Sequence, residues 1–203
     1  TQTAKRFKAE IEKELKHLGM GRTKLWVKMD CFNPPQADEL GPHGADRVAF
    51  LITSQPGEEP RPLSKVASGG ELSRIMLAIK TILAEVDQVP VLIFDEVDAG
   101  VGGAVAEAVG RKLKSIARTH QVFCITHLPQ IAMLADGHYQ VEKAVEAGRT
   151  TTWVSKLDRS ERIQEIARML GGKEITPITL QHARELLTRS EATPGPTLKS
   201  RPS

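Results

Sequence analysis

Apolar residues recur every three or four positions in several stretches of the chain, which is the spacing of one face of an α-helix. This pattern predicts helices over residues 1–18, from Gly69 or Gly70 onward, over 104–117 and over a short segment at 128–134. Two more helices are indicated by their caps: one begins after Asp158 and ends at glycines 171 and 172. The last runs from the Thr176-Pro177 pair to about Arg189.

Shorter apolar segments predict strands. Residues 24–32 and 47–53 lie between loops rich in Pro and Gly, at 33–46 and 54–62, and predict a small antiparallel sheet. Residues 139–146 and 150–157 predict a hairpin around Ala147 and Gly148. Unbroken apolar runs at 91–94 and 121–126 are typical of strands buried on both faces of a parallel sheet. With a helix between these two runs, the chain is predicted to be an α/β protein with a parallel crossover unit.

Polar residues follow directly after both of these strands. Asp95 and Glu96 come after the first, and His127 comes after the second. The carboxyl ends of parallel strands share one edge of the sheet, where open α/β sheets bind their ligands, so the three residues are predicted to lie together. Two carboxylates there suggest a metal ion and a polarised water. The alternatives are a solvated turn and a structural histidine.

A second candidate site is the start of the helix at 69. Ser68 and Glu71 have the S-x-x-E spacing of a capping box. Gly69 and Gly70 each cost about 1 kcal/mol relative to alanine in a helix, and a cap alone does not need them. Both are explained if an anion such as phosphate approaches the free N–H groups of the helix end. The alternative is an ordinary capped helix with a glycine turn.

The composition of the chain mainly excludes certain classes of protein. The 203 residues predict one domain with a possible appendage, and the 40% hydrophobic and 26% charged residues are typical of globular proteins. The net charge of +3 is too small to indicate nucleic-acid binding, and 4% aromatic residues give no stacking surface for bases. Cys31 and Cys124 lack metal-ligand spacing, and Cys124 is predicted to be a buried free thiol. With no signal peptide and no membrane span in the sequence, a cytoplasmic protein is expected.

Together these motifs resemble those of ABC-type ATPases. SGGE at 68–71 resembles the signature motif, VLIFDE at 91–96 the Walker B strand, residues 98–103 the D-loop, and His127 the switch histidine. ASGGELSR, FDEVDAGVGG, THLPQIA and EIARMLGG in combination are similar to the RecN family of bacterial DNA-repair proteins, relatives of the SMC proteins. The resemblance extends from about Lys24 to Leu187.

One expected motif is missing: no G-x-x-x-x-G-K-[ST] sequence, the Walker A loop, occurs in the chain. In RecN-like and SMC-like proteins this loop lies in an N-terminal lobe, separated from the C-terminal lobe by a long coiled coil. The resemblance therefore implies the C-terminal lobe of an ATPase head over residues 21–190, with a mostly parallel sheet flanked by helices. Residues 1–20 would be the returning root of the coiled coil, although the residues alone fit a local helix equally well. Residues 191–203, rich in Pro, Ser and Thr, are predicted to be disordered.

The resemblance also implies roles for the candidate residues in Mg²⁺-dependent ATP hydrolysis. Asp95 would hold Mg²⁺ through water, Glu96 would act as general base on the attacking water, and His127 would contact the γ-phosphate. The signature residues 68–71 would press on ATP bound to a second head, and Asp98 would lie at the seam of that head dimer. The chain alone is expected to be inactive, because it lacks Walker A.

The implied partners are the Walker A lobe of the same protein, a second head in a homodimer, and DNA. The implied role is DNA double-strand break repair and recombination in a cytoplasmic, nucleoid-associated protein. Two other interpretations stay open: the head lobe of a different SMC-like chromosome-organising ATPase, and a docking module without enzymatic activity.

Overall fold

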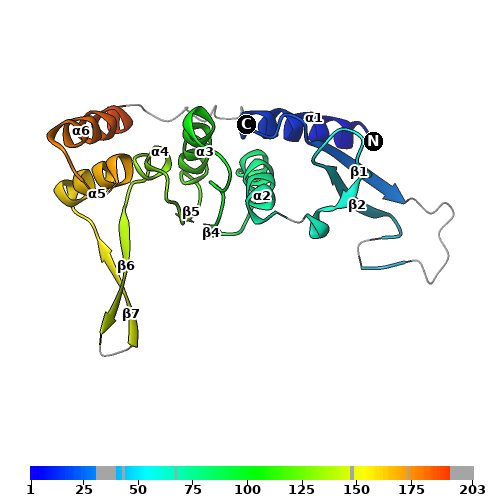
Figure 1. The fold of residues 1–203 in the computed structure, drawn as a ribbon. Helices are drawn as coiled ribbons and strands as arrows, with labels where there is room; N and C mark the ends of the chain where they lie inside the picture. The colour runs from blue at the N-terminus through cyan, green and yellow to red at the C-terminus, as the bar shows by residue number, and fades with distance from the viewer. Residues whose placement is uncertain (31–39, 43, 67, 147–148, 173, 193–203) are drawn as a thin grey trace, which may run out of the picture.

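The computed structural model describes residues 1–30, 40–42, 44–66, 68–146, 149–172 and 174–192, which form helices and three small sheets (Figure 1). The helices are α1 (Gln2–His17), α2 (Gly69–Leu83), α3 (Gly103–Ile116), α4 (Pro129–Ala132), α5 (Arg159–Gly171) and α6 (Pro177–Ala192). The strands are β1 (Lys24–Asp30), β2 (Arg47–Thr53), β3 (Arg61–Pro62), β4 (Val91–Phe94), β5 (Gln121–Cys124), β6 (Tyr139–Glu146) and β7 (Arg149–Lys156). A 3₁₀ helix spans Leu63–Lys65.

The N-terminal helix α1 forms as predicted. Its stripe of apolar residues packs inward, and Ile11, Leu15 and Leu18 are fully buried. They join a core cluster that includes residues of β1, α2, β4 and α3. In this structure α1 is therefore part of the lobe's own core as well as its N-terminal element.

The predicted antiparallel sheet is confirmed by the pairing of β1 with β2, from Lys24 opposite Thr53 to Asp30 opposite Arg47. A third strand, β3, pairs with β2 inside a segment that was expected to be a loop. Sequence pattern misses it because it has only two residues, one of them Pro62, and proline in a sheet is confined to edges. Residues 31–32, the end of the first predicted strand, lie outside the described residues.

The parallel part of the fold is the pair β4–β5, joined through α3. Val91 lies opposite Gln121 and Phe94 opposite Cys124. Helices lie on one side of this pair (Figure 1), and they bury Leu92 and Phe94. Among the described residues this is the one parallel pair, since the other two sheets are antiparallel. A parallel connection needs a crossover of a dozen or more residues, and α3 supplies it here.

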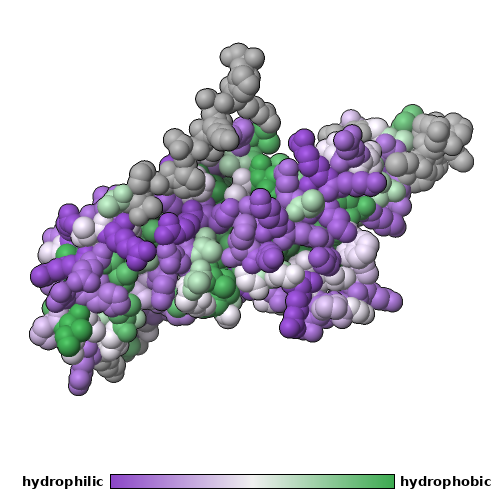
Figure 2. Space-filling model, turned by 90° about the horizontal axis from the view of Figure 1, so that it is seen from above, coloured by the Kyte–Doolittle hydropathy of each residue, from purple (hydrophilic) through white to green (hydrophobic). Residues whose placement is uncertain are grey.

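The prediction that β4 and β5 are buried on both faces is wrong. The apolar residues on the face turned away from the helices are exposed to between 40 and 71%: Val91, Ile93, Phe123 and Ile125. We call these four residues the bare strand face. By contrast, the view onto the helices shows a mostly hydrophilic surface (Figure 2). The apolar run of β4 is therefore typical of a strand covered on both sides, while the described residues cover only one.

A second core cluster lies at the C-terminal end of the described chain, where α4, α5 and α6 pack together. The predicted hairpin is confirmed, with Glu146 opposite Arg149. Asp158 and Glu161 form the full capping box of α5, and Gly172 with φ +78° follows its end. The last helix runs to Ala192, so the first two residues of the tail predicted to be disordered are helical. The remainder of that tail lies outside the described residues.

The α/β prediction is thus confirmed, with the parallel component limited to β4–β5. The elements form an elongated row, with α1, β1 and β2 at one end and α5, α6 and the β6–β7 hairpin at the other (Figure 1). Within the described ranges, no helix is both long and apolar enough to cross a lipid bilayer.

Candidate functional site

The two acids after β4 leave the strand in a sharp turn. Asp95 Oδ1 accepts a hydrogen bond of 2.9 Å from Glu96 N, and Ser73 Oγ of α2 donates to Asp95 O at 2.7 Å. Glu96 has φ +55°, in the left-handed region that is uncommon for residues other than glycine. Both acidic side chains are exposed. The turn therefore presents two carboxylates to solvent at the carboxyl edge of the parallel strands.

The N-terminus of α2 lies beside this turn. Ser68 is exposed and caps the helix, with Oγ accepting from Glu71 N at 3.3 Å. The reciprocal half of the predicted capping box is replaced by another bond, because Ser54 Oγ donates to Glu71 Oε2 at 3.1 Å. Glu71 therefore ties the helix start to the segment after β2.

Other residues of the same chain approach both Gly69 and Gly70 closely. A Cβ on Gly69 would clash with the Glu96 carboxylate, and a Cβ on Gly70 would lie 2.7 Å from Ala99 Cβ and 3.0 Å from Glu96 O. The approach of a phosphate to these glycines stays a prediction. In this structure the neighbour is the acidic turn, and the anion near Gly69 is a carboxylate.

Arg74, which the sequence argument did not single out, holds α2 to this turn. Its Nη1 donates to Val97 O at 3.3 Å and to Ala99 O at 2.8 Å, and the residue is 7% exposed. Burial lowers the pKa of Arg74, and the charges of Glu71 and Asp98 oppose that shift. The signal that could have found it is its position one helical turn after Gly70, on the buried face of α2.

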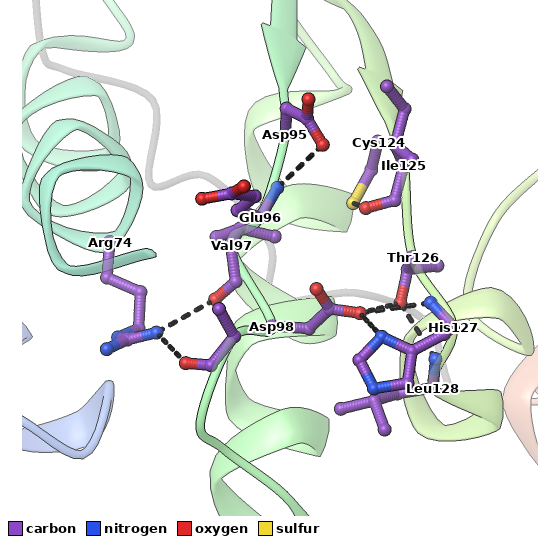
Figure 3. Close-up of polar contacts among 11 residues, drawn as sticks. Arg74, Asp95, Glu96, Val97, Asp98, Cys124, Ile125, Thr126, His127 and Leu128 are labelled. Atoms are coloured by element: carbon purple, nitrogen blue, oxygen red, sulfur yellow. Dashed lines mark hydrogen bonds and ion pairs between the residues drawn. The ribbon is translucent and has the colours of Figure 1, made fainter. Parts of the chain in front are cut away.

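Asp98 and His127 form a second linked group at the same edge. Asp98 Oδ2 accepts from Thr126 Oγ1 at 2.6 Å and from His127 N at 3.1 Å, and it lies 3.1 Å from His127 Nδ1. Asp98 was predicted to lie at a seam between two heads. That placement stays a prediction; within this chain the Asp98 carboxylate is buried and bonded, because the turn after Glu96 directs it toward β5 (Figure 3).

The structure confirms that Asp95, Glu96 and His127 share one edge of the sheet, since β4 and β5 are parallel and in register. It does not bring the side chains of Glu96 and His127 together. Glu96 turns toward α2, whereas the His127 ring lies on the far side of Asp98 (Figure 3). The edge therefore holds two groups, one around the glycines and one around the histidine.

Cys124, at the end of β5, lies behind this edge. It is a half-buried free thiol. Burial, followed by the charges of Asp98 and Asp95, raises its pKa to about 12. A thiol in that state stays protonated, so it packs as a small apolar residue and is a poor nucleophile or metal ligand.

The described residues contain no group of three or more His, Cys, Asp and Glu side chains placed to hold a metal ion. A protein-only cage is thus lacking in this part of the chain. Mg²⁺ is usually bound by one or two carboxylates together with waters and substrate phosphates. The exposed Asp95 carboxylate fits that requirement as a single ligand.

Comparisons with known proteins concern the fold and the sequence of the chain. No family model matches the chain. Among solved structures, the chain resembles an Smc head domain with a coiled coil and joint from Pyrococcus yayanosii. The TM-score is 0.55 and the identity 16%, over 85% of this chain and 30% of that one. The fold is that of part of an Smc head domain.

The sequence relatives are more specific. The chain is 45% identical over 198 residues to DNA repair protein RecN of Bacillus subtilis (strain 168), covering 93% of this chain and 34% of that protein. It is 46% identical over 186 residues to RecN of Treponema pallidum (strain Nichols), covering 91% and 32%. This chain is a homologue of the C-terminal end of RecN, and it spans about a third of the length of these relatives.

Proposed function

We propose that this chain is the C-terminal lobe of the ATPase head of an SMC-like protein that acts in DNA double-strand break repair and recombination. In this proposal it supplies the signature motif, the Walker B acids, the D-loop and the switch histidine for ATP hydrolysis. A Walker A lobe of the same protein supplies the remaining part of the nucleotide pocket. The observation that supports the proposal is the shared carboxyl edge of β4 and β5, which Asp95, Glu96 and His127 all follow directly or within three residues.

Each residue at the edge has a task that its placement allows. Glu96, whose carboxylate is exposed, orients the attacking water and takes its proton. His127, with its exposed ring, meets the γ-phosphate, and Asp95 would hold Mg²⁺. Bound Mg²⁺ would neutralise charge on the phosphates. Phosphoryl transfer depends mainly on positioning and charge stabilisation, so these groups suffice once the nucleotide is held.

The bare strand face supports a missing lobe. Four large apolar residues on two adjacent strands form an exposed patch of a kind that marks interaction sites. The homologous RecN proteins have about two-thirds of their length outside the aligned region. We infer that the Walker A lobe covers this face. ATP bound to that lobe would then be clamped by Ser68 and the glycines of a second head in a homodimer.

The test of the catalytic assignment is Glu96→Gln in a protein that contains both lobes. ATP binding should stay within about twofold, while turnover should fall by about 100-fold or more, because the general base is lost. The matched control is Glu107→Gln on α3, an exposed glutamate paired with Arg111. Wild-type turnover in Glu96→Gln would remove Glu96 from the catalytic role.

A docking module without enzymatic activity is the second candidate, and the bare strand face is the observation that favours it. Mixing this chain with a separately produced Walker A lobe distinguishes the two. Release of inorganic phosphate by the mixture, and by neither part alone, supports the ATPase. Tight association without phosphate release supports the docking module.

A further inference from the structure

The buried carboxylate of Asp98 contacts the segment that carries His127. One oxygen, Oδ2, is within 2.6 Å of Thr126 Oγ1 and 3.1 Å of both the backbone nitrogen and Nδ1 of His127. The Asp98 side chain is 5% exposed, whereas the His127 side chain is 75% exposed. The buried Asp98 carboxylate thus contacts the solvent-exposed ring of His127 (Figure 3).

This contact determines which ring nitrogen carries the proton. An ionised carboxylate only accepts hydrogen bonds, so a hydrogen bond across the 3.1 Å contact between Asp98 Oδ2 and His127 Nδ1 has Nδ1–H as its donor. The partner of one imidazole nitrogen sets the role of the other. Nε2 is therefore the ring atom left to meet a ligand. It accepts from water in the neutral ring and donates to a phosphate oxygen in the charged ring.

The backbone on either side of Asp98 is held by α2. Arg74 binds the carbonyl oxygens of Val97 and Ala99, the two residues that flank Asp98. The turn at residues 97–99 is therefore held from two sides, by Arg74 through the backbone carbonyls and by the Thr126–His127 segment through the Asp98 side chain.

We propose that Asp98 is the positioning residue of His127: it fixes the ring orientation and the Nδ1–H tautomer so that Nε2 faces the nucleotide. This inference rests on the proposed function. Asp98 acts within its own chain and does not touch the nucleotide. Thr126 supports the carboxylate through the same oxygen.

The first test uses this chain alone and needs no nucleotide. Long-range ¹H–¹⁵N spectra of the six histidines, with His127 assigned through His127→Gln, report which ring nitrogen is protonated in the neutral ring. The wild-type chain should show Nδ1–H, and Asp98→Ala should shift the ring toward Nε2–H. Asp98→Asn should keep Nδ1–H, because the amide oxygen still accepts. Nε2–H in the wild-type chain would overturn the proposal.

A matched variant separates positioning from general packing. Thr126→Val removes one bond to the carboxylate but leaves the carboxylate in place, so the Nδ1–H tautomer should survive. Loss of the tautomer in Thr126→Val to the same extent as in Asp98→Ala would show a packing effect and contradict the proposal. Because Asp98→Asn preserves the shape of the side chain, it keeps the test decisive if Asp98→Ala fails to fold.

The second test uses the two-lobe protein. Asp98→Ala should lower kcat by about 10- to 100-fold with little change in KM, as expected for a residue that orients a ligand-contacting group. Asp98→Asn should recover part of that loss, and Asp98→Ala with His127→Gln should be no slower than His127→Gln alone. Additive losses would overturn the positioning role. If the wild-type protein hydrolyses no ATP, the proposed function fails, while the tautomer result still stands on its own.

Discussion

At the scale of single residues, the strand ends could be predicted from the sequence and the loops that follow them could not. An apolar run followed by acids indicates where Asp95 and Glu96 lie, whatever the loop does next. The inward turn of Asp98 and the bridge made by Arg74 depend on the backbone path after Glu96, which has a positive φ. No local pattern specifies such a path, because glutamate is not a residue that favours that conformation.

The two glycines at the start of α2 should respond differently to the same substitution. Gly70→Ala places a methyl group against Ala99 Cβ and a backbone oxygen, which cannot easily move. We expect it to lower the free energy of unfolding by about 1–3 kcal/mol, as overpacking does. Gly69→Ala meets only the flexible end of the Glu96 side chain, so it should be nearly neutral. Urea unfolding of both variants measures this, and equal losses would contradict the packing argument.

Arg74 should contribute more to stability than an exposed arginine on α3. Arg74→Met removes the donor for two carbonyl groups at a buried site, and we expect a loss of about 2–3 kcal/mol in the free energy of unfolding. Arg111→Met is the control, because its ion pair with Glu107 is solvent-exposed and such pairs contribute about 0–1 kcal/mol. Similar midpoints for the two variants in urea would remove Arg74 from its linking role.

At the scale of elements, helices were predicted well because their caps and periodicity are local. The Asp158–Glu161 box and the stripe of α1 both form as expected. The strand β3 and the one-sided burial of β4 were missed, since both depend on what lies next to a strand and not on its own residues. The apolar run of β4 is typical of a strand covered on both faces, and the described residues cover only one.

The free energy of unfolding should decrease in acid because of a histidine at the junction between α4, the hairpin and α5. His138 is half-buried there, and its Nδ1 has no hydrogen-bond partner in the described part of the chain. Burial, followed by the charge of Arg162, lowers its pKa below 6.5, against a smaller opposing effect of Glu165. As pH falls below about 6.5, the unfolded chain binds a proton that the folded chain does not. Stability should therefore decrease until the pH has passed the lower pKa of the folded state.

The measurement is urea unfolding of the wild-type chain and His138→Gln at pH 7.5 and pH 5.5. The wild-type chain should lose more stability than the variant between the two values. His182→Gln, at an exposed position on α6, is the control and should behave like the wild-type chain. An unchanged pH response in His138→Gln would exclude this histidine as the source.

At the scale of the whole molecule, the bare strand face leaves apolar residues exposed on the side of β4 and β5 opposite the helices. By contrast, the view onto the helices is mostly hydrophilic (Figure 2). The resemblance to RecN-like proteins implies a separate Walker A lobe. We propose that such a lobe would contact the bare strand face.

The bare strand face should make the isolated chain prone to self-association and to binding apolar dyes. We expect the chain to bind the dye ANS and to self-associate at high concentration. Ile93→Thr with Phe123→Thr should lower ANS fluorescence several-fold, while the β-branched threonine preserves strand propensity. Val86→Thr, at an exposed position outside this face, should change nothing. Sedimentation and fluorescence measure both effects, and equal dye binding by all three proteins would show that the face is covered in solution.

The uncovered side of β4 has a consequence for biosynthesis. In a full-length protein of the kind this chain aligns with, the ribosome makes the first two-thirds before Val91 emerges. At about 5–20 residues per second, the earlier-made lobe would wait on the order of tens of seconds for its counterpart. During that interval it would expose an unpaired apolar surface. Molecular chaperones bind nascent intermediates of this kind.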